Sequence, residues 1–79
     1  MLRFNPRSQL HVHDEVAVMR PHSWGNEIVG LTKVKHVGHV LVETDDGQFY
    51  SASDGESIGA RQLTYLEPAT GVHRAALGQ

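Results

Sequence analysis

The chain contains no cysteine among its 79 residues. A disulfide framework and a thiolate-bound zinc site are therefore excluded, and nothing in the composition requires an oxidising compartment. Long hydrophobic runs are missing as well, because no window approaches the roughly 20 apolar residues that cross a bilayer. Residues 1–7 lack the apolar stretch of a secretory signal. The sequence thus predicts a cytoplasmic protein without a membrane span, stabilised by packing alone.

An excess of charge of one sign is also missing. Seven Lys and Arg stand against nine Asp and Glu, which gives a formal net charge of −2. Domains that bind duplex nucleic acid usually neutralise several phosphates with a clustered basic face. The balance therefore disfavours general affinity for nucleic acid, although the six histidines add positive charge in a mildly acidic environment.

What the chain does contain is a series of short β-type segments rich in valine and isoleucine and separated by turns. They span residues 15–20, 28–37, 40–44, 48–52 and 63–66. Val16 and Val18 alternate with Ala17 and Met19, which is the period of a strand with two different faces. Asp45-Asp46-Gly47 supplies residues that accept positive φ in a tight hairpin turn.

Irregular segments connect and flank these strands. Residues 21–26, which include Trp24, are expected to form a loop, and a change of parity over residues 30–33 predicts a bulge or bend. Residues 57–62 are expected to hold one short helical turn, and Pro68 ends the last strand. A chain this short forms a single domain. We expect an irregular N-terminal arm over 1–12, a β body over 13–67 and a flexible C-terminal tail over 68–79.

The order of these pieces resembles the SH3-like small β-barrels that include KOW and Tudor-like modules. The similarity lies in the entry strand at 13–18, the bend at 25–30, the strand at 40–42 and the hairpin at Asp46-Gly47. It extends over about residues 12–67. The resemblance implies an all-β, five-stranded SH3-like barrel, a fold that hosts many unrelated functions.

A narrower resemblance is to the plasmid-borne type II dihydrofolate reductases, SH3-like chains that assemble as homotetramers around a shared pore. Val16, Trp24, Ile28-Val29-Gly30 and Gln48-Phe49-Tyr50 are similar in order and spacing to the signature of that family. The resemblance implies a pore lined by Gln48, Phe49 and Tyr50. The pore lysine of that family falls at Val18, so its folate-anchoring charge is missing.

A second narrow resemblance is to the small SH3-like subunit of photosystem I that helps to dock ferredoxin. Residues 16–24, together with Asn26 and Glu27, look like its first strand and loop. This resemblance implies a peripheral adaptor for an acidic redox protein. An acidic chain attracts an acidic partner poorly over long distances, which argues against it.

No convincing catalytic set or metal site emerges from the motifs. The segment 55–59 matches a nucleophile elbow around Ser57, and Glu67 and His73 follow in the order of a hydrolase triad. That elbow needs a long helix leaving it on a large α/β sheet, which the remaining residues cannot build. The histidine pairs at 11 and 13 and at 36 and 39 are interpreted as surface groups with weak adventitious metal affinity. We therefore predict neither a metal nor a cofactor.

Exposed aromatic and basic side chains are the remaining candidates for function. Trp24 is either an exposed recognition ring or a plug for one end of the barrel, and both uses are common in small barrels. Phe49 and Tyr50 fall on opposite faces of a strand, so one is expected in the core and the other partly exposed. Lys33 and Lys35 share a strand face, which suits contacts to phosphate or a solvated sheet edge.

The sequence therefore predicts a non-enzymatic interaction module that binds a protein partner, with nucleic acid as an alternative that the net charge disfavours. The rival function is the reductase-like homotetramer, and a third interpretation is a symmetric dimer formed through Met19 or Leu41. The predicted binding residues are Trp24, Lys33, Lys35, Gln48, Phe49 and Tyr50.

Overall fold

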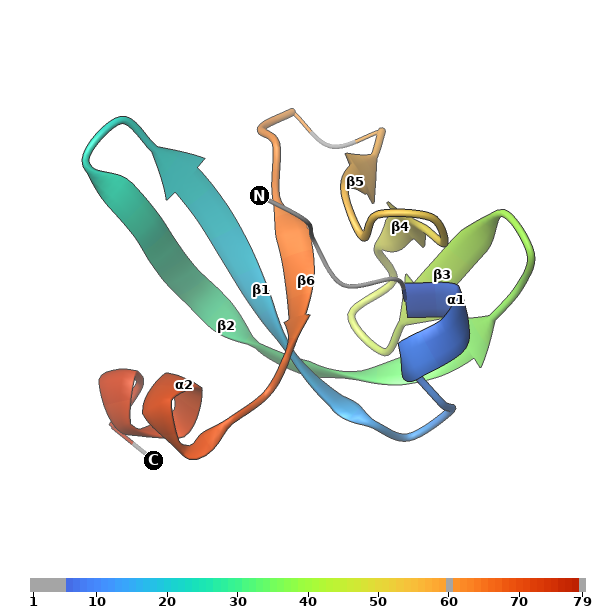
Figure 1. Cartoon of the computed structure of the whole chain (residues 1–79), viewed down its shortest axis with the longest axis horizontal. Coiled ribbons are helices and arrows are strands. Elements are labelled where there is room, and N and C mark those ends of the chain that lie inside the picture. The colour runs from blue at the N-terminus through green and yellow to red at the C-terminus, as the bar shows by residue number, and fades with distance from the viewer. Residues whose placement is uncertain (1–5, 60, 79) are drawn as a thin grey trace.

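The computed structural model describes residues 6–59 and 61–78, and within them the chain is mostly antiparallel β-sheet. The elements are α1 (Pro6–Gln9), β1 (Glu15–His22), β2 (Gly25–Val37), β3 (Leu41–Thr44), β4 (Phe49–Ser51), β5 (Ser57–Ile58), β6 (Tyr65–Pro68) and α2 (Gly71–Ala76). The strands form one six-stranded sheet in the order β5-β4-β3-β2-β1-β6. Figure 1 shows the long hairpin of β1 and β2 extending away from the shorter strands β3, β4 and β5. The all-β class that the sequence predicts is confirmed.

Strand β2 is long because it serves two neighbours. Its first half pairs with β1 and its second half with β3. The register slips at two places, which leave Val29 opposite β1 and Lys35 opposite β3 as extra residues. The sequence predicts one bend over residues 30–33, whereas the two bulges lie just outside that range. Bulges increase the local twist and bend of a strand, which lets β2 leave one partner and join the next.

The hairpin between β1 and β2 is tighter than the sequence suggests. The predicted loop over 21–26 is wrong, because β1 continues to His22 and β2 begins at Gly25. Pro21 pairs opposite Asn26, beyond the part of β1 that pairs with β6. Among the described residues, no strand pairs with that side of Pro21, so the N–H that proline lacks is not needed there.

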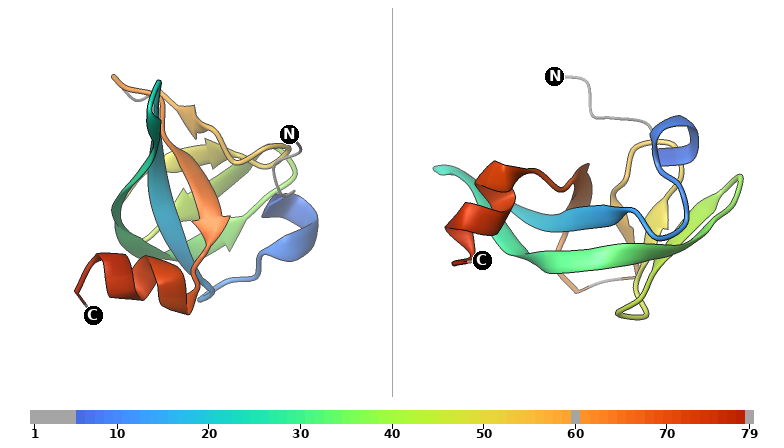
Figure 2. Two further views of the ribbon diagram at one scale, coloured as in Figure 1. Left: turned by 60° about the vertical axis from the view of Figure 1, so that its left-hand side comes forward. Right: turned by 90° about the horizontal axis from the view of Figure 1, so that it is seen from below.

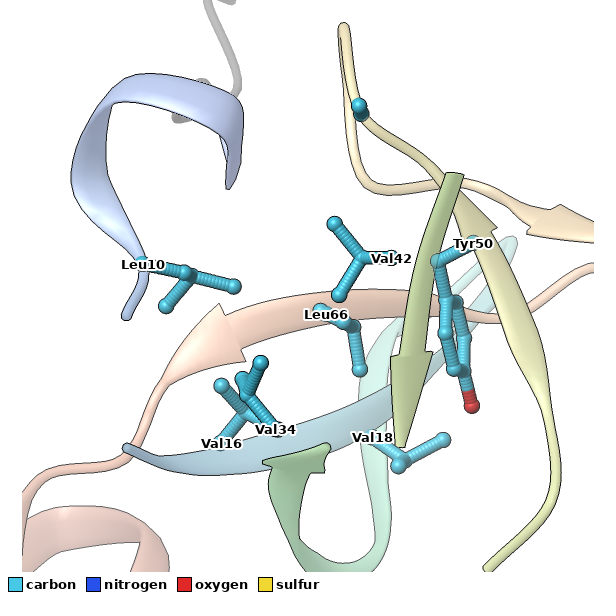
Figure 3. Close-up of a cluster of buried hydrophobic side chains, with 8 residues drawn as sticks. Leu10, Val16, Val18, Val34, Val42, Tyr50 and Leu66 are labelled. Carbon is cyan, nitrogen blue, oxygen red and sulfur yellow. The ribbon is translucent and has the colours of Figure 1, made fainter. Parts of the chain in front are cut away.

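The predicted alternation in β1 produces two separate apolar clusters. Val16 and Val18 belong to the main core, together with Leu10, Val34, Val42, Tyr50, Ala52 and Leu66. Figure 3 shows Leu10 at one end of this core and Tyr50 at the other. The Tyr50 hydroxyl points towards Val18. Ala17 and Met19 pack on the opposite face against Tyr65. Met19 is only 6% exposed, so its predicted part in a dimer interface is wrong.

The two edges of the sheet approach each other without forming a continuous ladder. Glu56 and Tyr65 form an isolated bridge, and the Ser57 N–H donates to the Thr64 carbonyl over 2.8 Å. The helical turn expected over 57–62 is wrong at its start, because Ser57–Ile58 is the edge strand β5; Ala60 lies outside the described residues. The sheet therefore has six strands and is not closed by a full set of ladders, in contrast to the five-stranded barrel that the sequence predicts.

Short helices occupy the two segments that the sequence interprets as arm and tail. Leu10, just after α1, is 4% exposed and extends the main core, whereas residues 1–5 lie outside the described part of the chain. Helix α2 is tied to β1 through an ion pair between Arg74 and Glu15. Figure 2 shows α1 and α2 at different ends of the molecule, with α2 beside β2. Packing supplies this local order, since neither helix is long enough to be stable alone.

Candidate functional site

Trp24 lies at the tip of the β1–β2 hairpin and is 73% exposed. The alternative that it plugs a barrel end is therefore wrong. Its ring stacks on His22, with centroids 4.5 Å apart and an angle of 9° between the planes. His22 Nε2 in turn lies 2.8 Å from Glu27 Oε1, and this hydrogen bond holds the pKa of Glu27 below its ordinary value. The tip thus presents an ordered aromatic surface, but no other predicted binding residue is adjacent to it in the strand pairing.

Gln48, Phe49 and Tyr50 do not share one surface. Tyr50 is 1% exposed and belongs to the core, whereas Phe49 is 41% exposed on the opposite face of β4. The expected division of the two aromatic residues between core and surface is confirmed. The ring of Tyr50 cannot serve as an exposed recognition surface, because it is packed inside the sheet. Side chains alternate across a strand, so Phe49 points away from the face of Gln48 and Tyr50, and the three residues cannot line one pore wall together.

Lys33 and Lys35 are exposed on β2, and Lys35 is the extra residue of the second bulge. Lys35 Nζ lies 3.7 Å from Glu43 Oε2, which offsets part of its charge. Two further basic residues, Arg20 and Arg61, line a hollow at the Tyr50 end of the core. The basic side chains therefore do not form one continuous surface for phosphates.

The hydrolase-like motif is partly assembled, but its serine is elsewhere. His73 Nε2 lies 2.9 Å from Glu67 Oε2, as a triad would require. Ser57 Oγ instead accepts the Thr64 N–H over 3.0 Å at the β5–β6 edge. The Thr70 N–H donates to His73 Nδ1 over 3.0 Å, so the His73–Glu67 pair caps the first turn of α2. Within 6–59 and 61–78, no group of three or more His, Cys, Asp or Glu side chains could hold a metal ion.

The structure has an exposed apolar surface on β3, β4 and β5 that the sequence did not predict. Glu43 pairs with Phe49, and Phe49 pairs with Ile58, so these residues share the outer face of the sheet. Leu41 has the same parity as Glu43 on β3, and Val40 precedes it. We call this surface the Phe49 face and define it by Val40 (73% exposed), Leu41 (37%), Phe49 (41%) and Ile58 (45%).

The Phe49 face is hollowed rather than flat. Phe49, Leu41 and Val40 line a depression of about 330 Å³, and His36 and His39 lie at the same depression. The outward parity of 41, 43 and 49 against the buried 42, 44 and 50 could have revealed half of this surface in the sequence. The contribution of Ile58 could not be seen, because residues 57–62 were expected to be helical.

A second hollow, of about 300 Å³, is lined in part by Val18 and Tyr50, and Figure 3 shows the Tyr50 hydroxyl pointing towards Val18. We call it the arginine hollow and define it by three apolar and three charged lining residues: Val18, Val29, Tyr50, Arg20, Asp46 and Arg61. Burial and the nearby carboxylate of Asp46 raise the pKa of Tyr50, and a hydrogen bond with Thr64 opposes that shift. The phenol therefore remains protonated at neutral pH and can donate a hydrogen bond.

Comparisons with protein-family models, with curated proteins and with solved structures found no match to this chain. Among the residues that the structure describes, no helix has the length and apolar character needed to cross a bilayer.

Proposed function

We propose that this chain is an SH3-like small barrel that acts as a non-enzymatic interaction module and binds a protein partner through the Phe49 face. The barrel interpretation is supported by the strand order and by the bridge between Glu56 and Tyr65, which brings the two edge strands together. The long, doubly bulged β2, shared between β1 and β3, is the kind of bent strand by which a small sheet curls on itself.

The observation that carries the function is the clustering of exposed apolar side chains on one sheet face. Small proteins expose single apolar residues routinely, but a contiguous apolar surface with a hollow marks a site of interaction. Phe49 lies at the centre of this face, between Glu43 on β3 and Ile58 on β5. An aromatic ring at the centre of such a surface is the common form of an energetic hot spot.

The chemistry of the face favours protein over nucleic acid. The nearest lysine, Lys35, is paired with Glu43, and the chain as a whole carries a formal charge of −2. Phosphate binding would require unpaired cations clustered around the apolar centre. A partner protein with apolar side chains of its own needs no such charges, and the imidazoles of His36 and His39 at the hollow supply polar contacts.

The decisive experiment is affinity capture, in which the proteins retained by the wild type are compared with those retained by Phe49→Ser and by a matched control, Val72→Ser. Val72 is 77% exposed on α2, so both changes replace an exposed apolar side chain with serine. We expect a protein retained by the wild type and by Val72→Ser to be lost from Phe49→Ser, with unchanged circular dichroism for all three.

Two results would overturn the assignment. Loss of the partner in Trp24→Ala but not in Phe49→Ser would move the binding surface to the hairpin tip. Sedimentation of the purified chain as a tetramer that binds dihydrofolate would replace the interaction module with the reductase-like function.

A further inference from the structure

The arginine hollow is positively charged although the whole chain is acidic. Its defining residues include two positive side chains, Arg20 and Arg61, and one negative side chain, Asp46. The formal charge of these residues is therefore 2 − 1 = +1, whereas that of the whole chain is −2. Arg61 forms no ion pair with another described residue. An anion entering this hollow therefore meets an available guanidinium in a cleft that concentrates its field.

The second guanidinium is only partly satisfied by the protein itself. Arg20 Nη1 lies 3.5 Å from Glu27 Oε1, and that same oxygen is already 2.8 Å from His22 Nε2. Arg20 Nε is inaccessible to solvent and has no hydrogen-bond partner among the described residues. A buried donor without an acceptor is unfavourable, and a small rotation of the half-exposed head group would offer its Nε–Nη2 edge to a ligand carboxylate.

The remaining wall of the hollow is mixed: Val18, Val29 and Tyr50 form its apolar part, and Gln48, Gln62 and Thr64 form its polar part. Val18 and Tyr50 belong to the main core, and Val29 is held outward by the first bulge of β2. The volume of about 300 Å³ is at the small end of the range for ligand pockets. A hollow of this volume has room for a single ring beside its apolar part.

Among the described residues, Asp46 supplies the one carboxylate of the hollow, and this carboxylate is directed partly to the backbone. Asp46 Oδ1 accepts the Gln48 N–H over 3.2 Å and also accepts the Thr44 hydroxyl, so it serves the β3–β4 turn. Its negative charge still opposes an anionic ligand. This opposition provides a test, because asparagine preserves the accepting oxygen and removes the charge.

We propose that the arginine hollow binds a small carboxylate attached to an apolar ring. The carboxylate pairs with Arg61 and Arg20, and the ring lies against Val18, Val29 and the edge of Tyr50. This site is separate from the Phe49 face, which is lined by different residues, and it does not depend on the proposed protein partner.

The test is a two-dimensional NMR titration of the ¹⁵N-labelled chain with benzoate, benzamide and acetate. Benzoate is expected to shift the amide signals of Val18, Val29 and Gln48 and to reach saturation. Benzamide has the ring without the charge and acetate the charge without the ring, and each is expected to bind at least about fivefold more weakly. N-Acetylphenylalanine, compared with benzoate, distinguishes the carboxyl end of a peptide from a free aromatic acid as the source of this chemistry.

Three variants locate the site. Arg61→Gln is expected to weaken benzoate binding at least about fivefold, whereas Arg74→Gln, the same change on α2, leaves it unaltered. Asp46→Asn is expected to strengthen binding about twofold, since a nearby like charge is removed. Equal benzoate affinity in Arg61→Gln and Arg74→Gln, equal affinity for benzamide, or tighter binding of inorganic phosphate than of benzoate would each overturn the proposal.

Discussion

Among the single residues, Tyr50 combines a buried ring with a hydroxyl at the edge of the arginine hollow. Its ring closes one end of the main core, and an interaction with Thr64 opposes the upward shift of its pKa. Burial of the neutral phenol and the carboxylate of Asp46 both disfavour the phenolate in the folded chain. The same residue thus links core packing to the electrostatics of the hollow.

The raised pKa of Tyr50 predicts a loss of stability in alkali. The unfolded chain releases this proton near the ordinary pKa of 10.0, before the folded chain does. The contribution is therefore fully present below pH 10 and is lost as pH rises through the folded pKa. Tyr50→Phe is expected to flatten this part of the pH profile and, at neutral pH, to change the free energy of unfolding by no more than about 1 kcal/mol, because it removes the phenol hydroxyl and its interaction with Thr64. Urea unfolding of the wild type and of Tyr50→Phe, at neutral pH and between about pH 8 and pH 11, measures both effects. Parallel curves of unfolding free energy against pH for the two proteins would show that Tyr50 does not cause the alkaline loss of stability.

At the scale of elements, α2 depends on side chains at its first turn rather than on its own length. It has six residues, none of them buried. The Thr70 N–H is satisfied by His73, and Glu67 at the end of β6 holds the other nitrogen of that ring. A helix this short is stable only because such contacts fix it to the sheet.

His73→Ala is therefore expected to release α2. The substitution leaves the Thr70 N–H and the Glu67 carboxylate without their partner and costs about 1 kcal/mol, as the loss of a helix cap does. Amide exchange across Gly71–Ala76 should accelerate about fivefold, with little change in β1. Val72→Ala is the control, because it removes an exposed side chain from the same helix; equal exchange in the two variants would show that His73 does not hold the helix.

At the scale of the whole molecule, the main core unites segments that are distant along the chain. Leu10 follows α1, yet it packs in the same cluster as Val16 of β1, Val42 of β3 and Leu66 of β6. Leu10 is thus a structural part of the fold. In a chain of this size one buried leucine is a large part of the total stability, which is about 4–12 kcal/mol for 79 residues.

Leu10→Ala is expected to lower the free energy of unfolding by about 2–4 kcal/mol, because it removes buried methyl groups and leaves a cavity. Val12→Ala, two residues later and 46% exposed, is expected to change it by less than about 0.5 kcal/mol. Denaturant midpoints of the two variants provide the measurement. Similar midpoints would mean that Leu10 does not contribute to the core.

Local patterns in the sequence determined the all-β class, the two faces of β1 and the division of Phe49 from Tyr50. They could do so because side chains alternate across a strand whatever the partner strand is. The turn at Asp46-Gly47 was equally readable, because Gly47 adopts a φ of +83°, which few other residues tolerate. The exposure of Trp24 was one of two open alternatives, since a hairpin tip and a barrel plug look the same in a sequence.

Only the tertiary structure decided which strands meet and which side chains gather. The pairing of Phe49 with Ile58 made the Phe49 face, and the extra residue Val29 completed the wall of the arginine hollow. Both depend on register and bulges, which are set by the simultaneous packing of several strands rather than by any one segment. Arg20 and Arg61 are forty-one positions apart in the chain and line one hollow only because β1 and the β5–β6 connection are brought together at the Tyr50 end of the core.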